Sequence, residues 1–517
     1  MIKYEDFGAI GDGKTDDFNA IRKAHEKANE TGEAIKATAG KCYYLKNSEG
    51  HPIIIKTDTN WRGASFIIDD TEVSAARPET YPSCDIFRIE NDYEPLVLDE
   101  NSPFIRALNE NSPAILKDGK TKKLANGLGY PALLLIFNDD NIQYLRLGFE
   151  RDRGAPQKEI FVIDENGNIN EKTPALFDNE KITRIIAVRI DTKPITIEGG
   201  EITTLASQVH NDEERYREIA RGLMVCRPNT TLVSMSHYVK NEIPKGKVVN
   251  GRGFYGDSSR GFYKSDLAAN IEFRDCFATA RVMYGASYEI MFNHSYDIRL
   301  IRFVQNEENF VEPLNWWVMG SNFCKNISYD GCYLTRFDAH CGVYNVSIKN
   351  STVCSLRLTG GGEFSLENSR IKTKGYGNGI FIMLREDYGS TWRGDIKIKN
   401  CVYDSTLKNP KIETLKLIWA QWANHNFGYK TYMPSVYVDN LTFDERLGVK
   451  NVNLFYLENK DEAFSFVEDY SKESFDGTPN KNPYTAPKTV VIENNNAGVG
   501  YSLENKEFFS NTELIIK

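Results

Sequence analysis

Apolar and polar residues alternate in a nine-residue phrase that recurs along the second half of the chain. The second and fourth positions of each copy are apolar, which predicts a strand with one buried face. The copies are NIEFRDCFA, DIRLIRFVQ, NISYDGCYL, NVSIKNSTV, EFSLENSRI, DIKIKNCVY and SVYVDNLTF, beginning at residues 270, 297, 326, 345, 363, 395 and 435, with an earlier copy, PITIEGGEI, at residue 194.

The later positions of the phrase predict how the chain bends after each strand. The sixth position holds residues suited to turns and left-handed backbone, namely Asp275, Gly331, Asn350, Asn368, Asn400 and Asn440. The seventh position holds small residues, namely Cys276, Cys332, Ser351, Ser369 and Cys401. A strand, a corner and a second strand that recur at the length of one coil predict a parallel β-solenoid, because each coil buries its apolar face by stacking on the next. We expect the cysteines to point inward without forming disulfides.

Residues 8–15, GAIGDGKT, match the phosphate-loop pattern G-x-x-x-x-G-K-[ST]. Asp12, Asp16 and Asp17 surround this loop and would repel the phosphates of a nucleotide. The alternative is a helix start with Thr15 as its N-cap and the last two acids in its first turn. An apolar helix face follows, made of Phe18, Ile21, Ala24 and Ala28. We therefore interpret the loop as a structural cap with a solvated Lys14.

The segment DFGAIGDGKTDDFNAI, followed by the helix and by AIKATAGKCYYL, resembles the N-terminal cap of right-handed parallel β-helix proteins of the pectate-lyase and polygalacturonase superfamily, which includes many phage tailspikes. The resemblance rests on this motif in residues 1–70 and on the repeat pattern alone from residue 194 to about residue 455. It implies an all-β, right-handed parallel β-helix with a short N-terminal capping helix.

Four segments follow from these patterns. Residues 1–70 are expected to form the cap and first coils, and residues 194–460 the regular coils that carry a groove. Between them, residues 71–193 are polar with strand-like runs (ALLLIF, EIFVID and RIIAVRI), which predicts irregular coils with long insertions or a small lid. Residues 461–517 are expected to form a tail that packs on the solenoid.

Composition narrows the range of partners. The 517 residues carry a formal net charge of -9, which disfavours nucleic acid as a partner, and no apolar run is long enough to span a membrane. Nine cysteines form no CxxC pair, so neither a disulfide framework nor a zinc site is expected. The first residues lack a signal-peptide pattern; an extracellular, periplasmic or virion-associated location is favoured by the resemblance.

The strands that follow each phrase end in polar and aromatic residues, and equivalent positions of stacked coils line up along the axis. RFDAH supplies the first catalytic candidates, Asp338 and His340, which share a face of an extended strand and could act as general acid and base. LREDYGSTWRG supplies the second, Glu386 and Asp387. The structural alternatives are a buried Asp-His pair at a coil corner and an exposed, salt-bridged turn.

Substrate-binding residues are expected at the same strand ends, because acids among aromatic rings and arginines suit an anionic or hydroxyl-rich sugar chain. They are Tyr284, Asn322, Arg385, Tyr388, Trp392, Arg393 and Trp422. We expect them and the catalytic candidates on one solvent-facing surface. The glycines at 360–362 are expected to form a tight turn that leaves space beside it.

The prediction for function is a glycoside hydrolase that uses two carboxylates and needs no cofactor or metal. The active site of the polygalacturonases is not carried over, because DAHCG stands where their Gly-His-Gly motif would be. One rival is a polysaccharide lyase in which His340 or Arg385 removes a proton from a uronate, with calcium as a possible cofactor. The other is a tailspike-like or adhesive solenoid that binds a glycan without turnover, for which a homo-oligomer such as a trimer would be expected.

Overall fold

The structure is a computed structural model that describes residues 1–46, 50–74, 84–111, 116–144, 155–209, 218–241, 248–249, 252–253, 258–279, 288–305, 319–373, 379–405, 411–422, 429–459, 484–494, 496 and 498–517. The chain forms two compact units. Unit 1 comprises Met1–Glu94, Arg189–Gly320 and Cys332–Thr335, and unit 2 comprises Pro95–Val188, Ser321–Gly331 and Arg336–Lys517.

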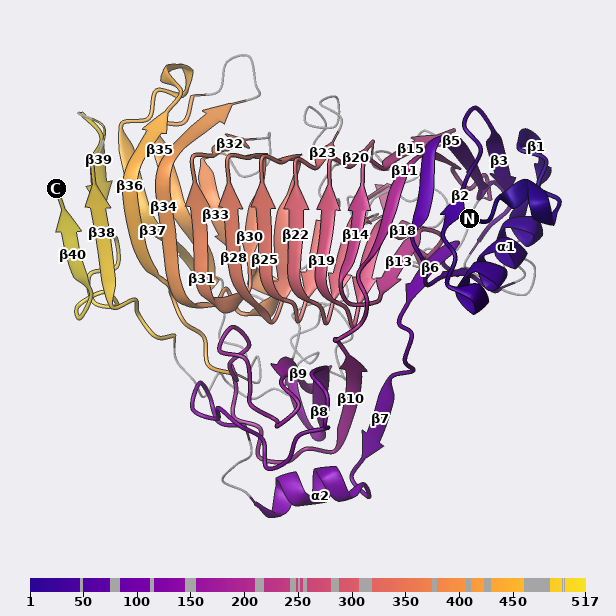
Figure 1. The fold of residues 1–517 in the computed structure, drawn as a ribbon. Helices are drawn as coiled ribbons and strands as arrows, with labels where there is room; N and C mark the ends of the chain where they lie inside the picture. Colours follow the sequence, from indigo (N-terminus) through magenta and orange to yellow (C-terminus); the bar gives the residue numbers. More distant parts are fainter. Residues whose placement is uncertain are drawn as a thin grey trace. The chain divides into compact units, whose positions relative to one another are not determined.

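Unit 1 begins with the expected cap, formed by η1 (Tyr4–Phe7), β1 (Asp12–Asp16) and α1 (Phe18–Thr31) (Figure 1). The predicted apolar face of α1 is buried. Thr15, however, does not cap the helix, so that prediction is wrong. It lies within β1, which pairs in parallel with β3 (Cys42–Leu45), and the N-cap position falls to Asp17.

Two carboxylates accept hydrogen bonds from backbone N–H groups of the phosphate-loop-like sequence. Asp12 accepts hydrogen bonds from the backbone N–H groups of Lys14 and Thr15, at 2.9 and 2.8 Å. Asp17 is buried and accepts from the N–H groups of Ile10 and Gly11, at 2.7 and 3.0 Å. Amides that a phosphate would need are thus already bound to negative charge, which supports the interpretation of the loop as a cap.

Parallel strands stack coil upon coil in the rest of unit 1. The first sheet contains β2 (Ile35–Lys36), β5 (Thr59–Asp69), β11 (Ile195–Leu205), β14 (Thr230–Val233), β19 (Ala269–Arg274) and β22 (Tyr296–Ile301). The second contains β4 (Ile53–Ile55), β6 (Phe87–Glu90), β13 (Leu223–Cys226), β18 (Ser258–Asp266) and β21 (Tyr288–Asn293). Short strands after the corner complete the coils: β15 (Ser236–Lys240), β20 (Phe277–Ala278), β23 (Val304–Gln305) and β26 (Tyr333–Leu334).

Unit 2 repeats this arrangement. Its first sheet contains β25 (Lys325–Asp330), β28 (Val343–Lys349), β31 (Gly360–Glu367), β34 (Trp392–Ser405), β36 (Ser435–Phe443), β38 (Thr489–Glu493) and β40 (Glu513–Ile516). Its second contains the end of β24 (Met319–Asn322), then β27 (Phe337–Cys341), β30 (Leu356–Leu358), β33 (Ile380–Leu384), β35 (Thr414–Trp422), β37 (Asn451–Asn459) and β39 (Gly500–Ser502). After the corner, β29 (Thr352–Val353) and β32 (Arg370–Thr373) pair in parallel. The chain is an all-β, right-handed parallel β-helix with a short N-terminal capping helix.

The described residues after 461 do not form the expected outer tail. β38 pairs in parallel with β36, and β40 pairs with β38, so both strands extend the coils. The physical reason is the same alternation as in the repeated phrase, because Val490 and Ile492 are fully buried.

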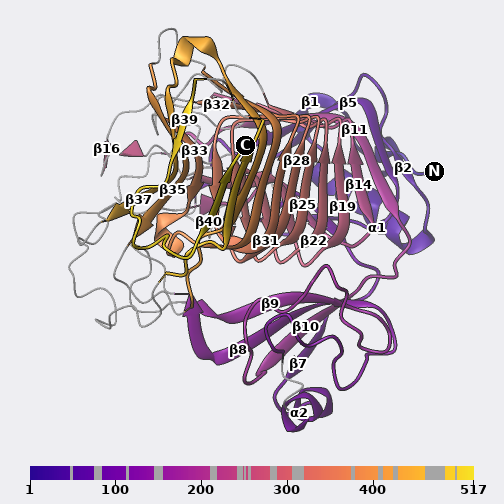
Figure 2. The ribbon, with the colours of Figure 1, turned by 90° about the vertical axis from the view of Figure 1, so that its left-hand side faces the viewer.

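Residues 95–188 form a small antiparallel sheet with its own core (Figure 2). We refer to this segment as the insert. The three strand-like runs of the sequence form strands here, and the order along the sheet is β7 (Leu96–Asp99), β10 (Arg184–Arg189), β8 (Ala132–Tyr144) and β9 (Ala155–Ile163). Helix α2 (Pro103–Glu110) packs Ile105 and Leu108 into this core.

The corners follow the prediction closely. All six predicted turn residues have positive φ, from 48° at Asn368 to 65° at Gly331. The asparagine side chains among them form a hydrogen-bonded ladder, because Asn400 donates to Asn368 at 3.2 Å and Asn440 donates to Asn400 at 3.0 Å. Cys276, Cys332 and Cys401 are buried, as expected, and none of them forms a disulfide with a described residue. No helix among the described residues is long and apolar enough to cross a membrane.

We expect Asp17→Ala to lower the free energy of unfolding by about 1–3 kcal/mol, because the N–H groups of Ile10 and Gly11 lose their acceptor. Lys14→Ala is the matched control, since its side chain is exposed and its loss should change stability by less than about 0.5 kcal/mol. Urea unfolding measures both. If the natural chain bound ATP and Lys14→Ala weakened this binding, the interpretation of the loop as a cap would be wrong.

Candidate functional site

Register between parallel strands builds a row of large side chains on the second sheet of unit 2. Asp338 of β27 pairs with Arg357 of β30, and Arg357 pairs with Met383 of β33. The row continues through Trp419 of β35 and Tyr456 of β37. The alternate residues on β27 and β30, such as Phe337 and Leu358, are buried in the coil interior. The row therefore lies on the outer side of this sheet.

A charged cluster forms beside this row, where β33 leads into the short helix η3 (Glu386–Tyr388). Arg385 donates through Nε and Nη2 to the two carboxylate oxygens of Asp387, at 2.9 and 2.7 Å. Its Nη1 donates to Oδ2 of Asp338 at 2.8 Å. Arg336 forms a further ion pair with Asp338. One guanidinium thus links both predicted acidic segments, and β30 is the strand between them.

Burial distinguishes this cluster from the solvent-facing surface that the sequence suggested. Asp338 is 1% exposed, and Glu386 and Asp387 are 7% and 6% exposed. The expectation that these side chains face solvent is wrong, because Arg336 and Arg385 compensate the carboxylates and allow them to be buried. The prediction that Asp338, Arg385 and Asp387 lie together is confirmed.

The environment shifts the pKa values of two carboxyl groups in opposite directions. Burial would raise the pKa of Asp338, but the positive charges of Arg336 and Arg385 outweigh burial and hold this pKa below its ordinary value. Burial raises the pKa of Glu386, and the nearby charge of Arg357 only partly opposes the shift. Both carboxyl groups act on the charge of Arg357, and two carboxyls that differ in this way can supply one ionised and one protonated group at the same pH.

The structure places His340 and its neighbours beside the cluster. The ring of His340 lies edge to face with Tyr388, with ring centroids 5.4 Å apart, and its Nδ1 is 2.7 Å from Oδ1 of Asn322. The guanidinium carbon of Arg385 is 5.8 Å from the centre of the Tyr388 ring. Asn322, His340, Arg385 and Tyr388 are therefore brought together as predicted.

None of the three remaining aromatic candidates can be placed on a binding surface from the described residues. Trp392 is fully buried and donates its Nε1–H to the carbonyl of Gly362 at 3.1 Å, so it packs in the coil interior and cannot line a groove. The backbone of Trp422 belongs to β35, but its side chain lies outside the described residues, as does all of Tyr284.

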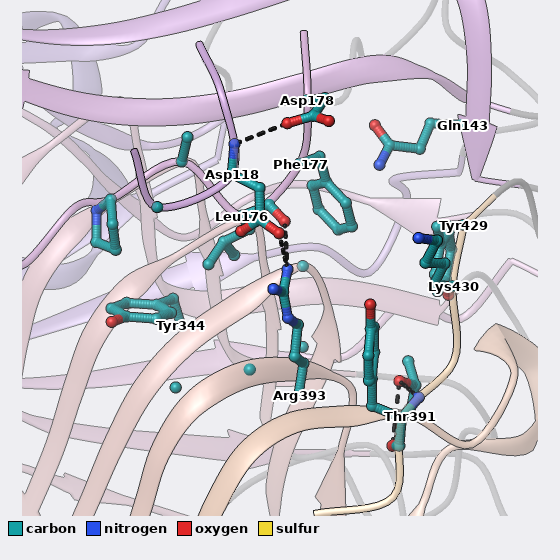
Figure 3. Close-up of a pocket in the computed structure, with 18 of the residues that line it drawn as sticks. Asp118, Gln143, Leu176, Phe177, Asp178, Tyr344, Thr391, Arg393, Tyr429 and Lys430 are labelled. Carbon is teal, nitrogen blue, oxygen red and sulfur yellow. Dashed lines mark hydrogen bonds and ion pairs between the residues drawn. The ribbon is translucent and has the colours of Figure 1, made fainter. Parts of the chain in front are cut away.

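Arg393, the last candidate, lines a different feature, a cleft of about 480 Å³ between the insert and the first sheet of unit 2 (Figure 3). Arg393 extends from β34 and forms an ion pair with Asp118 of the insert; its Nη1 also donates to the carbonyl of Leu176 at 3.3 Å. Its guanidinium lies 5.1 Å from the centre of the Tyr432 ring. Polar side chains of the insert that line the cleft are Asn141, Gln143, Gln157 and Asp178.

The cleft and the charged cluster share one structural element. Tyr429, which lines the cleft, donates its hydroxyl to the backbone carbonyl of Tyr388 at 2.6 Å. Tyr388 closes η3, the helix that carries Glu386 and Asp387. A ligand that contacts Tyr429 would therefore touch a side chain bonded to the segment that holds the two carboxyls.

Three consecutive glycines, at positions 360–362, line this cleft. They begin strand β31 and do not form the expected turn. At Gly362, with φ of 80°, an added Cβ would lie 2.7 Å from the ring of Tyr344, so glycine is needed for this ring to lie over the strand. In the sequence, only the three glycines and Arg393 pointed to this cleft, and no pattern indicated that residues of the insert would line it.

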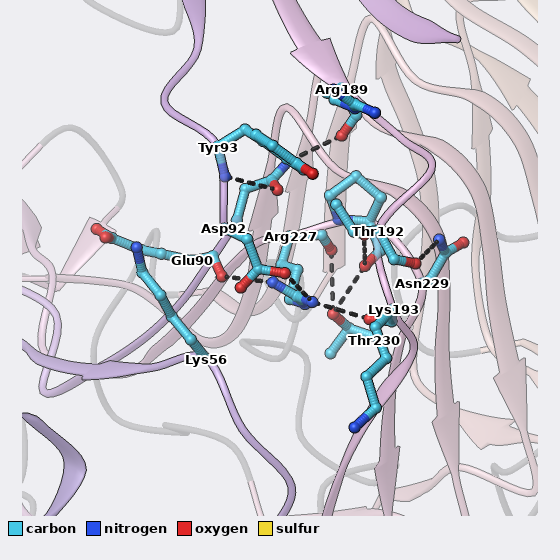
Figure 4. A network of polar contacts seen from close by, with 12 residues as sticks. Lys56, Glu90, Asp92, Tyr93, Arg189, Thr192, Lys193, Arg227, Asn229 and Thr230 are labelled. Atoms are coloured by element: carbon cyan, nitrogen blue, oxygen red, sulfur yellow. Dashed lines mark hydrogen bonds and ion pairs between the residues drawn. The ribbon is translucent and has the colours of Figure 1, made fainter. Parts of the chain in front are cut away.

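Unit 1 has its own buried polar network around Arg227 (Figure 4). Arg227 is 1% exposed and donates to Asp92 Oδ2 at 2.7 Å and to the carbonyl of Lys193 at 2.8 Å. Asn91 donates to the carbonyl of Arg189 at 2.8 Å. These contacts join the segment before residue 95 to the segment after residue 188, which indicates a structural role. No group of acidic, histidine or cysteine side chains suited to a metal ion occurs among the described residues.

Similarity to one solved structure supports the fold. No protein-family model matches the sequence, and no curated protein matches it. The gp54 tailspike of Acinetobacter baumannii bacteriophage AP22, solved in complex with A. baumannii capsular saccharide, is similar over 99% of this chain and 79% of its own, with 10% identity and a TM-score of 0.54. The tailspike gp49 from Pseudomonas phage LKA1 aligns over 99% of this chain and 84% of its own, with 11% identity and a TM-score of 0.47. At this level of identity the similarity to the first tailspike concerns the β-helix fold alone.

We expect Arg385→Met to lower stability at neutral pH by about 3–5 kcal/mol, because it leaves buried carboxylates uncompensated. Since the pKa of Asp338 is lowered in the folded chain, its contribution to stability is present above the unfolded pKa of about 3.9 and is lost as pH falls toward the folded pKa. The variant should therefore lose less stability than the natural chain between neutral and acidic pH.

Thermal unfolding across this pH range measures the effect of Arg385→Met. Arg385→Lys is a control that keeps the charge but cannot form the fork to Asp387. Equal acid sensitivity in the natural chain and in Arg385→Met would show that the ion pairs contribute nothing to folding.

Proposed function

We propose that this chain is a carbohydrate-active β-helix protein that cleaves a polysaccharide as a glycoside hydrolase. The observation that carries the proposal is the opposite pKa shifts of Glu386 and Asp338, two carboxyls of one cluster. The likeness in fold to a tailspike solved with a capsular saccharide supports a glycan as the ligand. Glycosidic hydrolysis needs one protonated and one ionised carboxyl, which is the combination that this cluster would supply.

Glu386 is the proposed general acid. Burial raises its pKa, so it keeps its proton at a higher pH than an ordinary glutamate, and its Oε2 has no hydrogen-bond partner among the described residues. In the proposed reaction Glu386 gives its proton to the leaving glycosidic oxygen while that oxygen separates from the anomeric carbon.

Asp338 is the proposed general base. Its Oδ2 accepts from Arg385, whereas its Oδ1 has no hydrogen-bond partner within the described part of the chain. It would take a proton from the water whose oxygen bonds to the anomeric carbon. Asp387 uses both oxygens to hold the guanidinium of Arg385, so we assign it a positioning role.

A second candidate is a glycan-binding solenoid without turnover. The observation that favours it is the burial of Asp338 and Asp387 in an arginine fork, which is a common structural arrangement. The form of the lyase in which Arg385 is the base receives less support, because Arg385 is already bound by two carboxylates and stays protonated; the form with His340 as the base is left to the test below.

A panel of bacterial surface polysaccharides distinguishes the three functions. New reducing ends alone indicate a hydrolase, reducing ends together with the ultraviolet absorbance of an unsaturated uronate indicate a lyase, and binding without products indicates a binder. On a cleaved polysaccharide, Glu386→Gln should reduce turnover about a hundredfold or more, because it cannot donate a proton. Turnover by Glu386→Gln that equals that of the natural chain would exclude Glu386 as the acid.

Glu386→Gln should lower turnover but raise stability at high pH. Because the pKa of Glu386 is raised on folding, its contribution to stability is present below the unfolded pKa of about 4.3 and is lost as pH rises through the folded pKa. Glu386→Gln removes the cost of the buried charge, so its melting temperature should exceed that of the natural chain at pH 8 and approach it at pH 4. A lower melting temperature at pH 8 would indicate that ionised Glu386 stabilises the fold.

A further inference from the structure

The cleft beneath the insert carries no net formal charge from its lining residues. Its charged side chains are two acids, Asp118 and Asp178, and two bases, Arg393 and Lys430. Asp118 and Arg393 form an ion pair, and Arg393 also donates to the carbonyl of Leu176. The arginine is therefore already compensated, and a carboxylate-bearing sugar would have to compete with Asp118 for it.

Carboxamides and hydroxyls make up most of the other polar lining. Gln157 donates to the carbonyl of Asp178 at 2.8 Å and accepts from Asn141 at 2.9 Å, which fixes the orientation of its amide. The hydroxyl-bearing residues of the lining are Tyr344, Thr359, Thr391, Tyr429 and Tyr432. Neutral groups held in fixed positions suit hydrogen bonds to sugar hydroxyls and amides, which are uncharged donors and acceptors.

Two buried atoms in the lining lack a partner. Gln143 is 4% exposed, its Oε1 has no hydrogen-bond partner among the described residues, and its side chain extends toward the ring of Phe177 (Figure 3). Thr359 is 2% exposed and its hydroxyl likewise has no partner there. A buried polar group without a partner costs about 1–3 kcal/mol. A ligand hydroxyl or N–H that reached both atoms would remove this cost.

Aromatic rings complete the lining. The ring of Tyr344 lies over Gly362 and is partly exposed, and Phe177 and Tyr429 are in contact, with ring centroids 6.0 Å apart. Rings of this kind offer flat apolar surfaces to the C–H faces of a sugar, while the neighbouring amides bind its polar edges.

We propose that this cleft is a binding subsite for an uncharged sugar of the glycan chain, with Gln143 and Thr359 as hydrogen-bonding partners and Tyr344 as a stacking surface. The inference rests on the proposed function, because it assumes that the ligand is a glycan. It goes beyond that function in two respects: it names the class of sugar as uncharged, and it assigns the sugar to a site separate from the carboxyl cluster at Glu386.

Equilibrium binding to the full chain carrying Glu386→Gln tests the subsite without cleavage. The probes are an array of bacterial capsular and cell-surface polysaccharides, both neutral and uronate-bearing, measured at low and at high salt. We expect binding to neutral glycans, or to neutral stretches of mixed ones, with little dependence on salt. Binding restricted to fully anionic glycans and abolished by salt would overturn the proposal, as would an array without any bound glycan.

Adding Gln143→Leu to this background should weaken binding of the selected glycan about tenfold or more, equivalent to about 1.4 kcal/mol. Its melting temperature should not fall, because the substitution removes a buried acceptor that lacks a partner. Asn101→Leu is the matched control, since Asn101 is an exposed carboxamide of the insert outside the cleft, and it should bind normally. Unchanged affinity in the properly folded Gln143→Leu variant would exclude the subsite.

The two proposals can fail independently. If the chain with Glu386→Gln still cleaves the glycan while Gln143→Leu weakens binding, the catalytic assignment is wrong and the subsite stands. If Glu386→Gln abolishes cleavage and Gln143→Leu leaves affinity unchanged, the hydrolase stands and the subsite is wrong.

Discussion

Parallel backbone hydrogen bonding in register is the constraint on which the rest of this structure depends. In each unit a strand pairs residue by residue with the equivalent strand of the next coil, so equivalent side chains recur about every 4.8 Å. Apolar positions then form continuous rows inside the coils. The same constraint forces the outer positions into rows, and the row from Asp338 through Arg357 to Met383 is one result.

The corners meet this constraint with residues that tolerate left-handed backbone. Asn368, Asn400 and Asn440 all have positive φ, at 48°, 52° and 58°. Asparagine is well suited to this position because its short amide reduces the penalty of the conformation and can bond to the amide of the next coil. The ladder that joins these residues therefore holds the register at the point where the chain changes direction.

Unit 2 treats buried polar groups in two contrasting ways. In the cluster around Arg385 the buried groups are charged. The guanidinium compensates Asp338 and Asp387 over short distances, while Asp338 Oδ1 and Glu386 Oε2 keep no hydrogen-bond partner among the described residues. In the cleft beneath the insert, Gln143 and Thr359 each keep an atom without a partner in the described residues. Satisfied polar groups contribute to the fold, whereas unsatisfied ones are costly and become favourable when a ligand binds. The buried groups of the cluster are charged and those of the cleft are neutral, and this difference is the reason to assign the carboxyl chemistry and the proposed sugar subsite to separate places.

The sequence by itself determined the coils, the corners and the cap. Alternation at positions two and four of the phrase is local, and the left-handed turn at position six depends on one residue, so both could be predicted without knowing which segments meet. Only the tertiary structure decided which polar residues are buried. Trp392 and Arg393 are adjacent in sequence, yet one packs in the coil interior and the other reaches Asp118 of the insert, because successive strand residues point to opposite faces. The cleft needs contacts between segments more than 200 residues apart, such as Leu176 with Arg393, and no local pattern encodes a contact at that separation.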